Sequence, residues 1–365
     1  MIVKILTFNR EENYGANLQA YALKIFLKQK NHEVSIINYK RENKYNFILN
    51  LVSKWLGKSI KSSFLKTKKN LTYFKINILK KKIFRKFQVD FLDFNDKVFN
   101  YNNIFKQTIN ADAFIVGSDQ IWSNEIVNDR DIHSFFLEFV TNTNSRKISY
   151  AASSGGENFK SSRKKIALNN LNSFQFVGVR ENSLKNHIQN LGLQNVFWTP
   201  DPTFLIDWND KLNFESIRQE NTISFFVLSN LNKHKITKII RSLKHSNKFK
   251  NLKENDMSCK ILNPFDWIIE IKKSKIFITD SYHAVLFSIF TNTPFIFTKW
   301  GKNFSRDERI MSVLNEFDLS FLATEEDFVS SSTLKKINNL NWDLINSKIK
   351  KTRNSGIEFL LKALN

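Results

Sequence analysis

Residues 277–294, FITDSYHAVLFSIFTNTP, predict a buried strand that turns into a helix, and this turn decides the fold class. The apolar start is typical of a strand, and the apolar spacing then becomes that of a helix. Asp280 and Ser281 stand between the two, and both are good N-cap residues for the unpaired amides of a first helical turn. Open α/β sheets hold anionic ligands where a strand's carboxyl end meets a helix N-terminus. His283, in that first turn, is therefore a candidate reaction centre.

The same alternation of strand and helix recurs along the chain. Apolar runs at residues 2–8 and 34–39 flank a helical pattern at 16–29, and a right-handed crossover makes two such strands parallel. Further strands are predicted at 112–117, 147–151, 176–179, 223–228, 260–262 and 294–297, and further helices at 180–191, 235–243, 264–273, 305–317 and from 334 onward. The sequence therefore predicts an α/β protein whose polar residues gather at the carboxyl edges of parallel sheets.

A length of 365 residues indicates two domains. Residues 199–203, TPDPT, hold two of the four prolines and mark the boundary. We therefore expect α/β domains at 1–198 and 199–330, followed by a helical tail at 331–365. The cleft between two such domains is a natural binding site.

The chain is strongly basic, with a formal net charge of +22. This charge favours anionic partners: nucleic acid, a membrane surface, or phosphorylated and carboxylated small molecules. The single cysteine, Cys259, excludes an intrachain disulfide and a thiolate metal cluster. The start of the chain does not resemble a signal peptide, and no run of about 18 uncharged apolar residues occurs. We expect the protein to work in the reducing cytoplasm.

A basic amphipathic insertion is predicted at about residues 44–90. Between Glu42 and Asp90 there is no acidic residue, and lysines recur from Lys54 to Lys86 among apolar groups. This pattern suits a surface that rests on anionic lipid, and a solvated helix face in a lysine-rich protein is an equally supported alternative. Nucleic acid is not expected as a partner, because no nucleic-acid-binding motif accompanies the charge.

Two strand ends carry side chains suited to acid–base work and anion binding. His283, with Asp280 and Ser281 within one turn, is a candidate acid or base, although a lone histidine near an apolar helix is usually structural. Arg180, between a strand and a helix, could clamp a carboxylate or phosphate, or form an ion pair with Glu181 or another acid. No metal site is expected, because the six histidines are scattered.

Six segments, taken in order, resemble the polysaccharide pyruvyl transferase family. They are NYGANLQAYAL (13–23), DAFIVGSDQIW (112–122), KISYAASSG (147–155), VGVREN (177–182), PDPTFL (200–205) and ITDSYHAVLFSIFTNTPFI (278–296). The family pattern has glycine where Ala284 stands, and we expect the added methyl group to lie where the backbone approaches the donor. The segment after Trp300 matches the family only loosely, around Arg309.

The resemblance implies two Rossmann-like domains in a glycosyltransferase-B-like arrangement with a central cleft. It also implies transfer of pyruvate from phosphoenolpyruvate to two hydroxyl groups of a sugar, in a surface polysaccharide or its lipid-linked precursor, with formation of a cyclic ketal. No cofactor is expected, and the enzyme is expected in the cytoplasm, peripheral on the inner membrane face. The expected roles are catalysis by His283, Asp280 and Arg180, donor binding by Arg180, Ser281, Tyr282, His283 and Arg309, and acceptor binding by Asn13, Tyr14, Asn17, Gln19, Asp119 and Gln120.

Two alternatives stay open. The same architecture would serve a glycosyltransferase that uses a nucleotide-sugar. The chain could also be a non-catalytic, membrane-apposed subunit of a polysaccharide assembly complex, in which the segment from Lys54 to Lys86 is the functional part.

Overall fold

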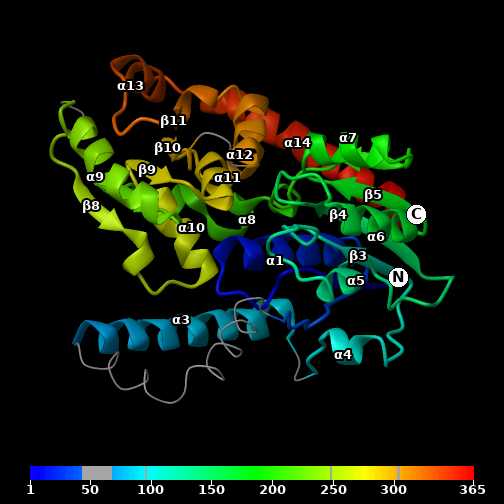
Figure 1. The fold of residues 1–365 in the computed structure, drawn as a ribbon. Helices are drawn as coiled ribbons and strands as arrows, with labels where there is room; N and C mark the ends of the chain where they lie inside the picture. The colour runs from blue at the N-terminus through cyan, green and yellow to red at the C-terminus, as the bar shows by residue number, and fades with distance from the viewer. Residues whose placement is uncertain (43–67, 95–96, 247–248, 302–304) are drawn as a thin grey trace. The chain divides into compact units, whose positions relative to one another are not determined.

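The computed structural model describes residues 1–42, 68–94, 97–246, 249–301 and 305–365. The chain divides into two units (Figure 1). The first unit comprises Met1–Leu205 and Ser355–Asn365, and the second comprises Ile206–Asn354. Each unit has its own parallel sheet, so the predicted α/β class is confirmed. The glycosyltransferase-B-like arrangement and the central cleft stay predictions.

The sheet of the first unit has the strand order β2-β1-β3-β4-β5-β6 among the described residues, and every neighbouring pair is parallel. Its strands are β1 (Ile2–Leu6), β2 (Glu33–Ile36), β3 (Ala113–Val116), β4 (Arg146–Ala152), β5 (Phe176–Val179) and β6 (Val196–Trp198). The helices are α1 (Tyr14–Gln29), α3 (Lys68–Leu92), α4 (Tyr101–Ile104), α5 (Asp131–Phe135), α6 (Ser161–Leu171) and α7 (Asn182–Asn190). The strands predicted in this half of the chain are confirmed, with ends that shift by a few residues.

The sheet of the second unit has the order β11-β10-β9-β7-β8 and is also parallel throughout. Its strands are β7 (Thr222–Phe226), β8 (Lys253–Asp256), β9 (Ile276–Thr279), β10 (Phe295–Thr298) and β11 (Ala323–Thr324). The helices are α8 (Trp208–Leu212), α9 (Asn230–Lys244), α10 (Pro264–Lys273), α11 (Tyr282–Phe290), α12 (Ser305–Glu316), α13 (Ser331–Asn338) and α14 (Trp342–Leu364), which continues into the first unit. The strand-to-helix turn of residues 277–294 is thus β9 followed by α11.

One predicted strand is wrong. Residues 260–262 lie between a short 3-10 helix and α10, and the strand of this region is β8, Lys253–Asp256. In the described sheet β8 pairs only with β7, at the edge, and its sequence KEND is exposed or half-buried. An edge strand of this kind needs no apolar run, so the apolar pattern pointed to the wrong residues.

The predicted boundary after residue 198 and the separate tail of 331–365 differ from the observed division. The TPDPT segment continues into the 3-10 helix Pro202–Phe204, which is buried and packs against α1 of the first unit. The unit therefore ends at Leu205, because burial of this segment's apolar side chains keeps it in the first unit. The prolines indicated a turn but not the end of the unit.

The last turns of α14 belong to the first unit because small residues let them approach its sheet. A Cβ atom added at Gly356 would lie 2.5 Å from the Tyr150 hydroxyl oxygen, and one added at Gly178 would lie 2.8 Å from the Phe359 ring. The Phe359 ring lies 5.8 Å from the Tyr150 ring and 5.8 Å from that of Phe197. The end of the predicted tail is therefore a docked part of the first unit's core.

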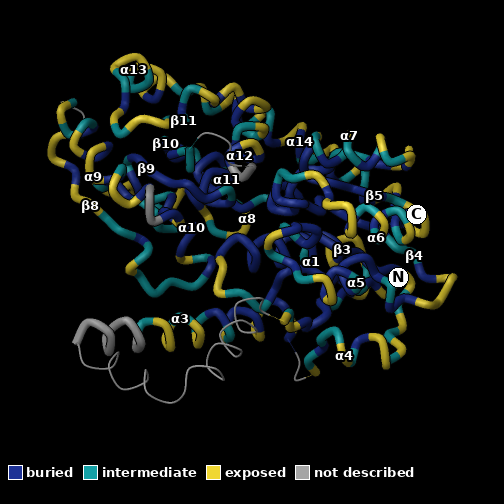
Figure 2. The backbone as a smooth tube through the Cα atoms, in the orientation of Figure 1, coloured by how far each residue is buried: buried dark blue, intermediate teal, exposed yellow. Residues whose placement is uncertain are grey.

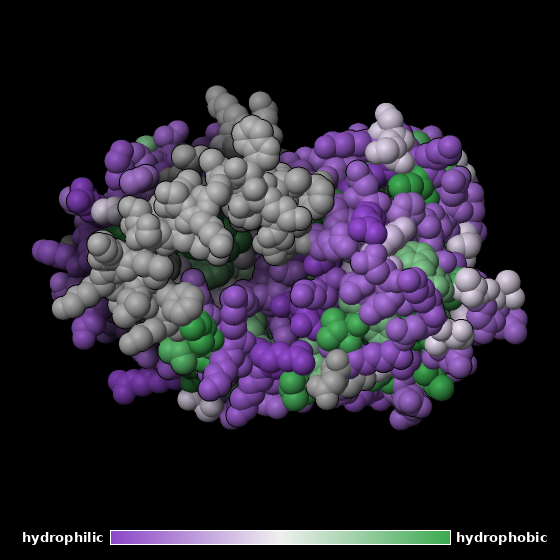
Figure 3. Space-filling model, turned by 60° about the horizontal axis from the view of Figure 1, so that its bottom comes forward, coloured by the Kyte–Doolittle hydropathy of each residue, from purple (hydrophilic) through white to green (hydrophobic). Residues whose placement is uncertain are grey.

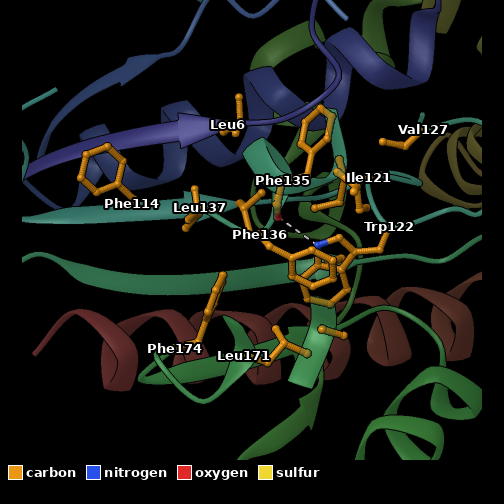
Figure 4. Packing of buried hydrophobic residues seen from close by; sticks show 14 of the residues in the cluster. Leu6, Phe114, Ile121, Trp122, Val127, Phe135, Phe136, Leu137, Leu171 and Phe174 are labelled. Atoms are coloured by element: carbon orange, nitrogen blue, oxygen red, sulfur yellow. Dashed lines mark hydrogen bonds between the residues drawn. The ribbon is translucent and has the colours of Figure 1, made fainter. Parts of the chain in front are cut away.

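The loop after β3 is anchored in an aromatic core (Figure 4). The Trp122 ring stacks on Phe136 with centroids 5.1 Å apart, and its indole nitrogen donates to the carbonyl of Phe135 at 3.0 Å. In Figure 2 the strands of both sheets are mostly dark blue, as their buried residues require. Rigid strands and an anchored loop hold the polar residues that follow each strand in fixed positions.

The described part of the predicted basic insertion is α3, which lies alongside α1 (Figure 1). Residues 43–67 of the insertion lie outside the described residues. On α3, Phe84 and Phe87 are buried, with their rings 5.0 Å from Tyr14 and 6.4 Å from Tyr21. The face of α3 that carries these phenylalanines therefore packs on the first unit, and the amphipathic character predicted for the insertion stays a prediction.

Candidate functional site

The loops that follow β3 and β4 are tied together at the carboxyl edge of the first sheet. The Asp119 carbonyl accepts from the Ser153 amide at 3.1 Å, and the Trp122 amide donates to the Ser153 carbonyl at 3.0 Å. Asp119 has a φ of 70°, and its carboxylate accepts from the Gln120 amide at 2.8 Å. The side chains of Asp119 and Gln120 are half-buried. These two predicted acceptor-binding residues lie in an ordered loop and retain some exposure.

Arg180, at the end of β5, lies in a buried network of acids. Its guanidinium group donates to Asp201 at 3.0 Å and to Glu181 at 3.4 Å, and all three side chains are at most 5% exposed. Ser118 donates to the same Asp201 oxygen at 3.3 Å, and Ser153 donates to Glu181 at 2.5 Å. The ion-pair interpretation of Arg180 is therefore correct, with two partners rather than one. Donor binding by Arg180 stays a prediction.

The loop after β1 is held by side chains predicted to bind the acceptor. Asn13 is the exposed N-cap of α1, and its side-chain oxygen accepts from the amide three residues on at 3.2 Å. Asn17 and Gln19 are fully buried. Asn17 donates to the Asn13 carbonyl at 2.8 Å, and Gln19 donates to the Thr7 hydroxyl at 2.9 Å. Asn17 and Gln19 thus shape the loop, whereas Asn13 is exposed on it.

Asp280 does not cap α11 as predicted, because its carboxylate reaches another loop. It accepts from the amides of Leu228 at 2.7 Å and Ser229 at 2.9 Å, and from the Asn232 side chain at 3.0 Å. The N-cap of α11 is Ser281, whose side chain makes no capping hydrogen bond. The carboxylate accepts three hydrogen bonds in this position, whereas as an N-cap it would accept hydrogen bonds from two backbone amides, so the observed position is the more stable one. Asp280 therefore joins the end of β9 to the connection between β7 and α9.

We expect Asp280→Asn to lower the free energy of unfolding by about 1–3 kcal/mol at neutral pH, since the new amide nitrogen faces a donor instead of accepting from it. Burial raises the pKa of the Asp280 carboxyl above its ordinary value of 3.8, by more than its hydrogen bonds lower it. The folded state thus binds this proton more tightly than the unfolded chain. Stability contributed by the carboxyl falls as pH rises from about 4 through the raised pKa. The loss caused by Asp280→Asn should accordingly shrink over that range.

Denaturant unfolding of both proteins at several pH values between about 4 and 7 measures this difference. The exposed Asp210 on α8, changed to Asn, controls for the loss of one negative charge. A loss that is independent of pH would contradict the expectation.

The predicted donor-binding residues of the second unit gather at the start of α11. His283 is 9% exposed, and its ring lies edge-on to that of Tyr282 with centroids 5.2 Å apart. The Arg309 guanidinium carbon, on α12, lies 5.9 Å from the centroid of the same Tyr282 ring. Ser281 is 8% exposed and precedes them. An imidazole, a guanidinium group and a helix N-terminus are therefore brought together within one unit.

The methyl group of Ala284 is fully buried. This small side chain contributes to the packing of α11. That the backbone approaches the donor at this position stays a prediction.

Several polar residues of these two edges were not predicted as site residues. They lie after a strand, in the loop that follows it or in the first turn of the next helix, and they are Thr7, Ser118, Ser153, Glu181, Asp201 and Asn232. Four of them, Ser118, Ser153, Glu181 and Asp201, lie in the motifs quoted above, and that position was the available signal. Their burial could not be read from the sequence, because it depends on strands far apart in the chain.

Within the described ranges, no group of three or more His, Cys, Asp or Glu side chains is placed to hold a metal ion. Over the same residues, no helix is both long enough and apolar enough to cross a membrane.

Comparison with known proteins identifies a family. The family model for polysaccharide pyruvyl transferase matches residues 13–302. No curated protein sequence matches the chain. Among solved structures, UDP-GlcNAc 2-epimerase from Methanocaldococcus jannaschii aligns over 93% of this chain and 92% of its own, with 11% identity and a TM-score of 0.49. The Neisseria meningitidis UDP-GlcNAc 2-epimerase bound to UDP-GlcNAc aligns over 99% of each chain, with 11% identity and a TM-score of 0.47. The family match is the comparison that bears on function.

Proposed function

Because the chain belongs to the polysaccharide pyruvyl transferase family, we propose that it transfers pyruvate from phosphoenolpyruvate to two hydroxyl groups of a sugar and forms a cyclic ketal. The sugar would belong to a surface polysaccharide or to its lipid-linked precursor. The observation that carries the proposal is the group of His283, Tyr282 and Arg309 at the start of α11. Tyr282 and His283 lie within the residues that match the family, and Arg309 comes from α12, which follows them in the chain.

This group supports donor binding through its charge and position. Arg309 supplies a planar cation that matches a carboxylate or phosphate, and the N-terminus of α11 adds a favourable helix dipole. The centroid of the Tyr282 ring lies 5.9 Å from the Arg309 guanidinium carbon and 5.2 Å from the centroid of the His283 ring. Phosphoenolpyruvate carries both anionic groups on three carbons, so one such site could hold it.

The reaction needs a group that gives and takes protons. Protonation of the donor's methylene carbon creates an oxocarbenium-like centre, which one sugar hydroxyl attacks as it loses its proton. The phosphate group then leaves with its bridging oxygen, and a neighbouring hydroxyl closes the ring. An imidazole can serve in both steps near neutral pH, so His283 is the proposed acid and base. Asp280 positions the loops around it and accepts three hydrogen bonds.

Acceptor binding is assigned to the carboxyl edge of the first sheet. Asn13 is exposed, and Asp119 and Gln120 are half-buried in an ordered loop. The amide groups of Asn13 and Gln120 can both donate hydrogen bonds to sugar hydroxyls and accept them, and the Asp119 carboxylate can accept them. Tyr14, Asn17 and Gln19 support this loop from behind, since all three are buried.

A mass-spectrometric screen of lipid-linked and nitrophenyl sugars with phosphoenolpyruvate tests the function. One acceptor should gain the mass of pyruvate less one water, with release of one phosphate. Release of a nucleoside diphosphate from a nucleotide-sugar would show a glycosyltransferase instead. Membrane binding without turnover of any donor would favour the non-catalytic assembly subunit.

We also propose that α3 rests on an anionic membrane surface. Ile78, Leu79 and Val89 are 48%, 46% and 46% exposed, on the side opposite the buried phenylalanines. Lys82 and Lys86 are exposed with them, four and eight residues after Ile78, so apolar and basic groups share one helix face. Figure 3 turns the lower side of Figure 1 forward and shows mainly hydrophilic residues there, with hydrophobic ones in small separate patches.

The double variant Lys82→Glu with Lys86→Glu should weaken sedimentation with phosphatidylglycerol vesicles about 10- to 100-fold, since each lysine near such a surface contributes about 1 kcal/mol. Lys164→Glu with Lys165→Glu on α6 makes the same change of charge elsewhere in the first unit. An equal loss in both double variants, or no loss in either, would refute a membrane-binding role for α3.

A further inference from the structure

Two arginines in the first unit form no salt bridge with a carboxylate among the described residues. Arg10 stands in the loop after β1 and Arg85 stands on α3, and both are half-buried. The Nη1 atom of Arg85 is buried and has no hydrogen-bond partner among the described residues. Arg10 donates one hydrogen bond, at 2.6 Å, to the side chain of Asn38. Partly buried guanidinium groups normally have an anionic partner, because loss of hydration otherwise disfavours the charge.

The surroundings of Arg10 disfavour its charge. Burial lowers the pKa of Arg10, and the nearby Arg85 lowers it further, with only a smaller opposing effect from Glu11. An anion between the two arginines would remove both unfavourable effects.

Packing holds the two arginines in place. The Phe84 ring, next to Arg85 in the chain, lies 5.0 Å from the ring of Tyr14 at the start of α1. One turn earlier on α3, the Lys81 ammonium group lies 4.0 Å from Glu12. Arg85 also places its guanidinium carbon 5.5 Å from the Phe94 ring. α3 therefore cannot move away from the β1–α1 loop without losing these contacts.

The acids of the loop are already engaged. Glu11 binds Arg41 at 2.5 Å, with a second guanidinium nitrogen at 3.2 Å. Glu12 is the partner of Lys81. The positive charge of Arg10 and Arg85 is thus not neutralised within the described part of the chain.

We propose that Arg10 and Arg85 bind a phosphate ester that is attached to the sugar acceptor. Two guanidinium groups can each donate paired hydrogen bonds to phosphate oxygens, which is the geometry they match best. The N-terminus of the 16-residue helix α1 adds a favourable dipole at the same loop. Asn13, assigned above to the acceptor, caps that helix. The sugar and its phosphate would therefore bind at adjacent points of one loop.

This inference rests on the proposed function for the identity of the sugar, but its anion site can be tested without turnover. The probe is inorganic pyrophosphate, titrated by calorimetry into the full chain. Arg85→Met and Arg10→Met should each weaken binding about 10- to 100-fold, as expected for the loss of charge-assisted hydrogen bonds. Methionine keeps the length and apolar stem of the side chain, so α3 should stay packed. Lys165→Met, at an exposed position on α6 of the same unit, is the matched control and should bind like the parent.

The source of the phosphate is decided by two further measurements on the same variants. With a phosphorylated sugar as acceptor, Arg85→Met should raise KM about 10- to 100-fold while kcat changes little, and with a neutral nitrophenyl sugar both constants should be unchanged. If only binding to phosphatidylglycerol vesicles falls, the phosphate belongs to a lipid headgroup and the acceptor assignment is overturned. Equal pyrophosphate affinity in the parent, Arg10→Met and Arg85→Met overturns the site itself. If pyrophosphate binding responds as expected but no acceptor gains pyruvate, the site stands and the proposed function fails.

Discussion

Replacing His283 with Ala or Gln should lower turnover of phosphoenolpyruvate by about 10²–10⁴-fold, because the proposed reaction loses the group that protonates the donor and deprotonates the hydroxyls. Gln keeps the volume and one hydrogen-bonding end of the side chain, so it separates proton transfer from packing. The measurement is phosphate release under saturating donor, with the melting temperature of each variant beside it.

His245, exposed near the end of α9 in the same unit, provides the matched control. His245→Gln removes an imidazole at a distance from α11 in the chain and should leave turnover unchanged. Near-normal activity in His283→Gln would exclude His283 as the acid and base. A protein that unfolds in both His283 variants would instead assign it a structural role.

Replacing Arg180 with Met should lower the free energy of unfolding by about 3–5 kcal/mol, since the buried carboxylates of Asp201 and Glu181 lose their cation. Arg130, 55% exposed and 3.4 Å from Glu42, is the control, and Arg130→Met should change stability by less than about 1 kcal/mol. Denaturant unfolding measures both.

A triple variant separates the structural role of Arg180 from donor binding. Adding Asp201→Asn and Glu181→Gln to Arg180→Met removes the unpaired charges and should restore most of the lost stability. If Arg180 also binds the donor, turnover stays low in the restored protein, with a raised KM for phosphoenolpyruvate. Full recovery of activity would leave Arg180 with a structural role alone. Failure to recover stability would contradict the ion-pair account.

Local signals in the sequence were sufficient for most of the fold. The apolar runs of β1, β3, β5 and β9 and the helical spacing after them require no knowledge of the rest of the chain, because each strand is buried on both faces of a parallel sheet. Edge strand β8 lacked that signal, since its residues KEND face solvent in part. The site residues Ser281, Tyr282 and His283 were found together for the same local reason: they are consecutive.

Local sequence signals could not predict the contacts between segments that are distant in the chain. Asp280 was expected to cap α11, yet its three donors come from residues some fifty positions earlier. The methyl group of Ala284 is fully buried in the packing of α11, which its neighbours in the chain do not determine. A hydrogen bond or a buried methyl depends on which elements meet, and the pattern around a single residue does not contain that information.

The stretch 277–294 by itself determined a strand, a turn and a helix with a histidine in its first turn, because period and capping chemistry are properties of neighbours in the chain. Only the tertiary structure decided that the Arg309 guanidinium carbon lies 5.9 Å from the Tyr282 ring centroid, that Arg180 pairs with Asp201, and that Arg85 lowers the pKa of Arg10. Each of these relations joins segments that are separate in sequence and meet only when the unit folds. The residue types of a site can thus be proposed from a sequence, whereas the charges that surround them depend on the packing of the whole unit.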